Sequence, residues 1–112
     1  MADIPIITLN SELISLLGFA QKSRNVDKGF QAVRHGLSRK RVAFLLLDKS
    51  LGESSLKKTM SIARQHKTPV LMVDDESKQN SLVSIAGYKI LGVHKGGLAT
   101  GFIKKLKQEY QW

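Results

Sequence analysis

The chain lacks cysteine and long apolar runs, and both absences narrow the possible classes of protein. Without cysteine, the 112 residues hold no disulfide scaffold, no Cys-ligated zinc or iron–sulfur site and no thiol nucleophile. No apolar run approaches the roughly 18 residues of a transmembrane helix. The first residues carry neither a basic flank nor a long apolar stretch, so they do not resemble a secretory signal. We therefore expect a cytoplasmic protein with no membrane partner.

Acidic residues are also scarce, and this scarcity points to a polyanionic partner. Lys and Arg number 18 against 9 Asp and Glu, for a net charge of +9. Such an excess favours nucleic acid as the first candidate partner. The hydrophobic share of 42% is enough for one core. We therefore expect one RNA-binding domain over residues 1–112, with residues 1–9 as an irregular lead-in.

The basic excess is concentrated in one segment of the chain. Residues 21–41 contain seven basic residues and a single acid, Asp27, and thus carry +6 of the net charge. A solvated helix face is the plain interpretation of such a cluster. Concentration in one window favours a binding face instead. Aromatic residues make up only 6% of the chain, and they do not alternate with the basic residues of this window. A binding surface for single strands needs such aromatic side chains, because the bases stack on them. Structured RNA is therefore the preferred partner.

Buried strands that alternate with amphipathic helices predict an α/β fold. Apolar runs of strand length occupy residues 42–47, 69–73 and 90–93. Helical apolar spacing and capping residues predict helices that begin near residues 10, 25, 55, 75 and 98. The order ααβαβαβα predicts a three-layer α/β/α sandwich with a small mixed sheet. In this prediction Gly36 ends the second helix and Gly87 ends the fourth.

The predicted start of the second helix is the best candidate site. Asn25 is a good N-cap, and the positive end of a helix dipole with free N–H groups suits phosphates. The helical spacing leaves four residues on the solvent face, namely Asp27, Lys28, Gln31 and Arg34. We expect basic side chains to neutralise phosphates here, namely Lys22, Arg24, Lys28 and Arg34. We expect short polar side chains to approach bases or sugars, namely Asn25, Asp27 and Gln31.

A second class of function remains open at the predicted strand ends. In open α/β sheets, sites form beyond the carboxyl ends of strands. A receiver-like or phosphatase-like domain could use the charged residues that follow the three strands, namely Asp48, Asp74, Asp75 and Lys95. The alternative is that these Asp residues cap turns and helices. His35 and His66 fall near predicted helix ends, where the dipole favours a cation, so we expect no metal site and no cofactor.

A third class is a protein–protein module of a ribosome or transcription complex, in which the basic face is merely solvated. Charge reversal at Lys28 and Arg34 separates it from RNA binding, because only RNA binding needs those charges.

Several local strings, in their order and spacing, resemble the L-seven-Ae family of ribosomal and kink-turn RNA-binding proteins, and in particular its small bacterial YlxQ-type members. The resemblance covers roughly residues 11–108. The strings that carry it are residues 16–20 (LLGFA), 32–36 (AVRHG), 47–50 (LDKS), 68–74 (TPVLMVD) and 97–99 (GLA).

This resemblance implies an α/β/α sandwich that inserts one helix N-terminus into an RNA kink-turn, and a non-enzymatic, ribosome-associated role. The strongest members of the family carry Gly-x-Asn-Glu-x-x-Lys at that helix end. The same seven positions here begin at Asn25 and end at Gln31, with Asp27 in place of Asn and Lys28 in place of Glu. The resemblance also implies that the loop after the fourth helix closes on the RNA, which here offers Tyr88 and Lys89.

Overall fold

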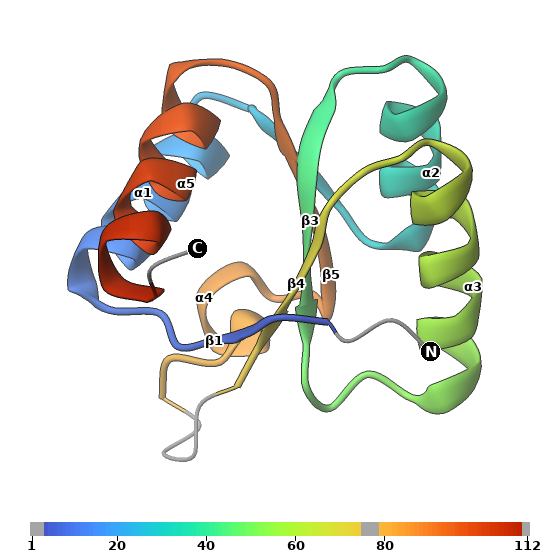
Figure 1. The fold of residues 1–112 in the computed structure, drawn as a ribbon, viewed down its shortest axis with the longest axis horizontal. Helices are drawn as coiled ribbons and strands as arrows, with labels where there is room; N and C mark the ends of the chain where they lie inside the picture. The colour runs from blue at the N-terminus through green and yellow to red at the C-terminus, as the bar shows by residue number, and fades with distance from the viewer. Residues whose placement is uncertain (1–3, 75–78, 111–112) are drawn as a thin grey trace.

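The computed structural model describes residues 4–74 and 79–110, which form a central sheet between two layers of helices (Figure 1). The elements in chain order are β1 (Ile6–Ile7), α1 (Ser11–Lys22), β2 (Val26–Lys28), α2 (Phe30–Ser38), β3 (Val42–Asp48), α3 (Glu53–Gln65), β4 (Val70–Val73), α4 (Leu82–Ala86), β5 (Ile90–His94) and α5 (Gly97–Tyr110). Helices α1, α4 and α5 cover one face of the sheet, and α2 and α3 cover the other. The predicted α/β/α sandwich is therefore confirmed.

The sheet is mixed, as predicted, and its strand order is β1-β4-β3-β5-β2. Strands β1, β4 and β3 run parallel to one another, whereas β5 runs antiparallel to β3 and β2 antiparallel to β5. The direction of β5 matters for any site at the strand ends. Because β5 is antiparallel, the residues that follow it lie at the opposite end of the sheet from those that follow β3 and β4.

Strand β3 lies at the centre of the sheet and is buried on both faces. Phe44 and Leu46 pack into the core under α1, α4 and α5, and Leu45 and Leu47 pack into the core under α2 and α3. This alternation follows from the pleat of a strand. Val42 joins the α2–α3 core because the β3–β5 register shifts between Val42 and Phe44. A continuous apolar run is thus what a two-layered core requires.

Local capping signals account for several helix ends. Asn10 Oδ1 accepts a hydrogen bond from the Leu13 N–H at 2.9 Å and begins α1. Ser81 Oγ accepts from the Ser84 N–H at 3.1 Å and begins α4. Gly87 ends α4 in the left-handed conformation with φ 78°, as predicted. The prediction that a helix begins at Asp74 and Asp75 is wrong for Asp74, which follows β4, and Asp75 lies outside the described residues.

Two further predictions are wrong at the edges of the sheet. Residues 1–9 are not irregular throughout, because Ile6–Ile7 pairs with Met72 and Val73 as an edge strand. The second helix does not begin at Asn25, because Val26–Lys28 pairs with β5 as the opposite edge strand. Val26 suits a helix face and a strand face equally, so only the pairing with β5 decides between them. Within the described part of the chain, no helix combines the length and the apolarity needed to cross a membrane.

Candidate nucleic-acid interface

The N-terminus of α2 is an exposed helix end directly after the edge strand β2. Gly29 is its N-cap, and the Gly29 N–H donates to the Ile90 carbonyl at 2.9 Å, which anchors the turn on β5. The backbone of Gly29 has φ 87°, a conformation that favours glycine. No side chain caps this helix end. The N–H groups of its first turn and the positive end of its dipole therefore remain open to an anion.

A second segment, far away in sequence, reaches the same helix end. A Cβ atom placed on Gly29 would lie 3.4 Å from Cδ1 of Tyr88, so the tyrosine ring packs directly against this turn. The Tyr88 side chain is nevertheless 48% exposed. Lys89 follows it, and its Nζ lies 3.4 Å from the Ser50 carbonyl, to which it donates. The Lys89 ammonium therefore points toward the loop after β3, and the open helix end is bordered by the exposed Tyr88 ring and by Lys28, which precedes Gly29.

The structure divides the predicted RNA-binding residues into two groups. Lys28, Gln31 and Tyr88 lie at the N-terminus of α2, and Arg34 lies about one turn along the same helix. Lys89 follows Tyr88, but its Nζ is directed to the Ser50 carbonyl. The remaining cations and Asn25 lie at the far end of β2, about 10 Å of strand away. Lys22 ends α1, Arg24 adopts φ 59°, and Asn25 donates from Nδ2 to Ser23 Oγ at 2.8 Å.

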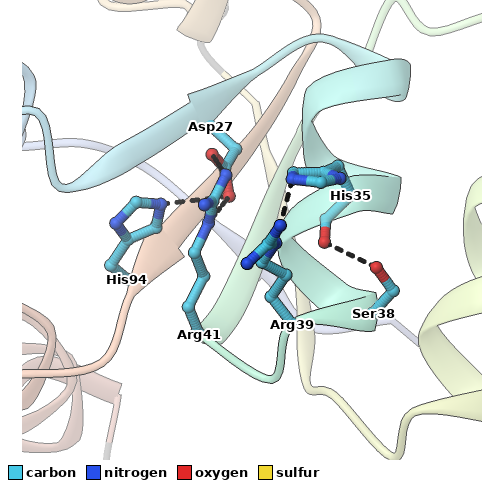
Figure 2. Close-up of polar contacts among 6 residues, drawn as sticks. All are labelled: Asp27, His35, Ser38, Arg39, Arg41 and His94. Carbon is cyan, nitrogen blue, oxygen red and sulfur yellow. Dashed lines mark hydrogen bonds and ion pairs between the residues drawn. The ribbon is translucent and has the colours of Figure 1, made fainter.

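Asp27 is not on a solvent face, and this prediction is wrong. Its side chain is buried, and Arg41 donates to both of its carboxylate oxygens, from Nη2 at 2.7 Å and from Nε at 3.2 Å (Figure 2). His94 Nε2 lies 3.0 Å from Asp27 Oδ2, without the alignment of a hydrogen bond. The hydrogen bond to Asp27 raises the pKa of Arg41. Asp27 therefore links the edge strand β2 to β3 and β5 and cannot read a base edge.

Gly36 explains how a carboxylate fits beneath α2. A Cβ atom at this position would lie 2.0 Å from Asp27 Oδ2 and 3.0 Å from Val42 Cγ2. The predicted role of Gly36 as the residue that ends the helix is wrong, because α2 continues to Ser38 and Arg39 is its C-cap. Gly36 is required by close packing between helix and strand. The strand alternation of β2 turns Val26 and Asp27 to opposite faces, and Asp27 meets α2 here.

The C-terminal turn of α2 carries its own polar contacts. Ser38 Oγ donates to the His35 carbonyl at 2.8 Å, and Arg39 Nε donates to His35 Nε2 at 3.2 Å (Figure 2). The predicted places of His35 in the last turn of α2 and of His66 at the C-cap of α3 are both observed. These histidines end helices, where cations and polar donors satisfy free carbonyls.

The described residues of the alternative phosphoryl-transfer site come together only in part, because Asp48 and Asp74 line one pocket and Lys95 does not. Asp48 ends β3, and Asp74 follows the parallel strand β4, where its Oδ2 pairs with Lys49 Nζ at 2.9 Å. Lys95 lies at the opposite end of the sheet, because β5 is antiparallel, and its N–H donates to the Arg41 carbonyl. Asp75 lies outside the described residues. The described members of the group are thus split between two ends of the sheet.

Asp48 has a structural role instead. It accepts hydrogen bonds from the Leu82 N–H at 3.0 Å, the Val83 N–H at 3.5 Å and both the N–H and hydroxyl of Ser50. Burial raises the pKa of this carboxyl, but the four hydrogen bonds outweigh burial and hold its pKa below the usual value. Asp48 therefore fastens the first turn of α4 to the end of β3.

Two residues at or beside the helix end, Gly29 and Lys58, are not among the predicted site residues. Gly29 is the true N-cap, and a glycine directly before the run Phe30, Val33 and Leu37 is the signal that could have revealed it. Lys58 of α3 lies over the Phe30 ring, with Nζ 5.0 Å from the ring centroid. That contact joins segments that are distant in sequence and has no local signal.

No family model matches the chain, and no curated protein matches its sequence. Solved structures do match its fold. A protein of unknown function from Bacillus halodurans superposes with a TM-score of 0.69 at 22% identity, over 85% of this chain and 96% of that one. The 15.5kD RNA-binding protein of Giardia lamblia superposes with a TM-score of 0.64 at 8% identity, over 93% and 92% of the two chains.

Two larger proteins contain a similar domain. An archaeal translation termination factor superposes with a TM-score of 0.57 at 18% identity, and this chain covers 23% of its length. The Pelota protein of Thermoplasma acidophilum superposes with a TM-score of 0.58 at 14% identity, and 27% of its length is covered. At these identities the likeness establishes the fold alone. The chain therefore has the L-seven-Ae-like α/β/α fold, which the Giardia RNA-binding protein shares.

Proposed function

We propose that this protein is a non-enzymatic, cytoplasmic RNA-binding protein, associated with the ribosome, that recognises structured, kink-turn-like RNA through the N-terminus of α2. One observation carries the proposal. An uncapped helix end and an exposed tyrosine ring lie against each other on the surface, with Lys28 directly before the helix end and Lys89 directly after the tyrosine in the sequence. Phosphates suit the helix end and the cations, and an unstacked base suits the ring.

The likeness of fold supports the same proposal, since the Giardia protein of this fold is described as RNA-binding. Occurrence of the fold in an archaeal translation termination factor supports a role near the ribosome. Burial of Asp27 against Arg41 also supports it, because an exposed carboxylate beside the helix end would repel phosphates. Gln31 is exposed in the first turn of α2, where its amide can meet a base edge or a ribose hydroxyl.

The proposal is tested by fluorescence anisotropy with a labelled kink-turn hairpin, titrated over a series of salt concentrations. A hairpin of the same length, with its internal loop replaced by Watson–Crick pairs, is the control RNA. We expect tighter binding to the kink-turn and a negative slope of log K against log salt. Absence of binding at low salt, or binding without a salt slope, would contradict RNA binding. Equal binding of both hairpins would contradict the kink-turn preference.

Matched variants test the proposed site. Tyr88→Ala should weaken binding by about 1–3 kcal/mol, the usual contribution of a stacked aromatic, whereas Phe19→Ala, at an even more exposed aromatic on α1, should not. Lys28→Gln should lower the salt slope by about 1, whereas Lys104→Gln on α5 should leave it unchanged. Equal effects within either pair would show that the interface lies elsewhere.

A further inference from the structure

A groove runs along the outer surface between α2 and α3, next to the proposed RNA site. It has a volume of about 800 Å³. Polar and basic side chains from both helices line it, among them Gln31, Arg34, Lys57, Lys58, Ser61 and His66. None of the described residues that line it is acidic. Its lining suits an extended anion.

The basic side chains of Lys57 and Arg34 form at most a weak ion pair with other described residues of the chain. Lys57 Nζ lies 3.6 Å from Glu53 Oε1, and both side chains are largely exposed, at 71% and 84%. Such a pair contributes little and yields easily to a competing anion. Arg34 is exposed on α2 and forms no ion pair within the described part of the chain. The charges in the groove are therefore available to an external partner.

The groove opens at the N-terminus of α2. Phe30, the first residue of the helix, contributes to both the helix end and the groove, and Lys58 Nζ lies over its ring. From there the groove follows α2 as far as Ser38. A helix of 9 residues is about 13 Å long at 1.5 Å per residue. The groove is therefore long enough for more than one phosphate of a nucleic-acid backbone.

We infer that the backbone of the bound RNA continues from the N-terminus of α2 along this groove, and that Lys57, Lys58 and Arg34 contact its phosphates. This inference rests on the proposed RNA-binding function and extends it to α3, from which the sequence analysis selected no RNA-binding residue. A nucleic-acid backbone is the occupant that the groove favours. Both this groove and the groove beside α5 carry basic side chains without an acidic one among their described lining residues. They differ in the rest of the lining, because polar residues predominate between α2 and α3, with Phe30 and Ile62 as the apolar members, whereas the groove beside α5 has an apolar floor that includes Phe44 and Ile103.

The test compares two double variants of equal charge change in the same salt titration with the kink-turn hairpin. Lys57→Gln/Lys58→Gln removes two cations from the α3 side of the groove. Lys104→Gln/Lys107→Gln removes two from α5, on the other face of the sheet. Because each phosphate contact contributes about 0.7–0.9 to the slope, the α3 variant should reduce it by about 1.4–1.8. The α5 variant should retain the slope of the unmodified protein. Thermal unfolding checks that both variants fold.

Lysine acetylation in the absence and presence of the hairpin, read by mass spectrometry, locates the contacts without any substitution. Protection of Lys57 and Lys58, with Lys104 and Lys107 still modified, would support the groove. If the unmodified protein binds the hairpin but the α3 variant has its full salt slope, or these lysines are unprotected, the inference is wrong and the proposed function stands. Absence of binding by the unmodified protein would overturn both.

Discussion

The two faces of the sheet differ in what they bury. Among the described residues, fifteen buried residues form the core under α1, α4 and α5, and seven form the core under α2 and α3. The face covered by α2 and α3, which has the smaller core, contains the buried ion pair of Asp27 and Arg41, the close approach at Gly36 and the proposed RNA site. One face therefore supplies most of the hydrophobic stabilisation, while the other uses polar contacts to position a helix end.

We expect the largest loss of stability from a substitution in the core under α1, α4 and α5. Phe102 of α5 is buried and stacks on Phe44 of β3 with ring centroids 5.2 Å apart. Phe102→Ala should lower the free energy of unfolding by about 3–5 kcal/mol, since it leaves a cavity. Urea denaturation measures this loss. A loss below about 1 kcal/mol would mean that the two faces do not differ as described.

The same substitution on the two faces should have opposite signs. Gly36→Ala in α2 forces Asp27 or the helix to move, because the new Cβ would meet Oδ2 at 2.0 Å, and should cost about 1–3 kcal/mol. Gly101→Ala in α5 meets nothing within 4 Å and should stabilise by up to about 1 kcal/mol through helix propensity. Thermal unfolding of both variants measures the sign and size of the two changes in stability.

RNA binding provides a second measurement on these two variants. Gly36→Ala should also weaken RNA binding, since β2 and Gly29 lead directly into the helix end, while Gly101→Ala should bind as the unmodified protein does. Unchanged stability and affinity in Gly36→Ala would contradict the packing role of Gly36.

Asp48 provides a pH test on the side of α4. Its pKa is lower in the folded protein than the value of about 3.9 in an unfolded chain. Its contribution is therefore complete above about pH 4 and is lost as the pH falls through the lower folded value. Asp48→Asn should cost about 1 kcal/mol at pH 7 and should flatten the decline of stability below pH 4. If the stability of the variant falls below pH 4 as steeply as that of the unmodified protein, other groups cause the decline.

The weakest change in stability is expected for an ion pair between α1 and α5, two helices of the face that has the larger core. Lys105 of α5 pairs with Glu12 of α1, and both side chains are at least partly exposed. Glu12→Gln should change the free energy of unfolding by about 0.2–1 kcal/mol, and added salt should reduce the difference. A larger loss would show that surface charge, as well as apolar burial, holds this face together.

The parts of the fold that the sequence predicted correctly all have local signals. The three buried strands, the helix that Asn10 caps and the stop at Gly87 follow from apolar spacing and cap chemistry within a few residues. The two missed strands, at residues 6–7 and 26–28, are very short and become strands only through pairing with β4 and β5. The start of α2 was misplaced for the same reason.

The candidate RNA-binding residues remain a prediction, and the structure shows only where they lie. Local charge and the family resemblance indicate the basic window, a helix end within it and the loop that carries Tyr88, whereas the packing of Tyr88 against Gly29 is visible only in the structure. Asp27 was misjudged, because no local pattern shows that Arg41 would reach it.

By itself the sequence determined the alternation of helices and strands and the excess of positive charge, because periodicity and composition are local properties of the chain. The tertiary structure alone determines which charged side chains remain exposed to solvent and which of them lie near one another. The antiparallel direction of β5 separates Lys95 from Asp48, and the approach of α2 to β2 across Gly36 buries Asp27 beside Arg41. Both outcomes depend on contacts between segments far apart in the chain, which local spacing does not encode.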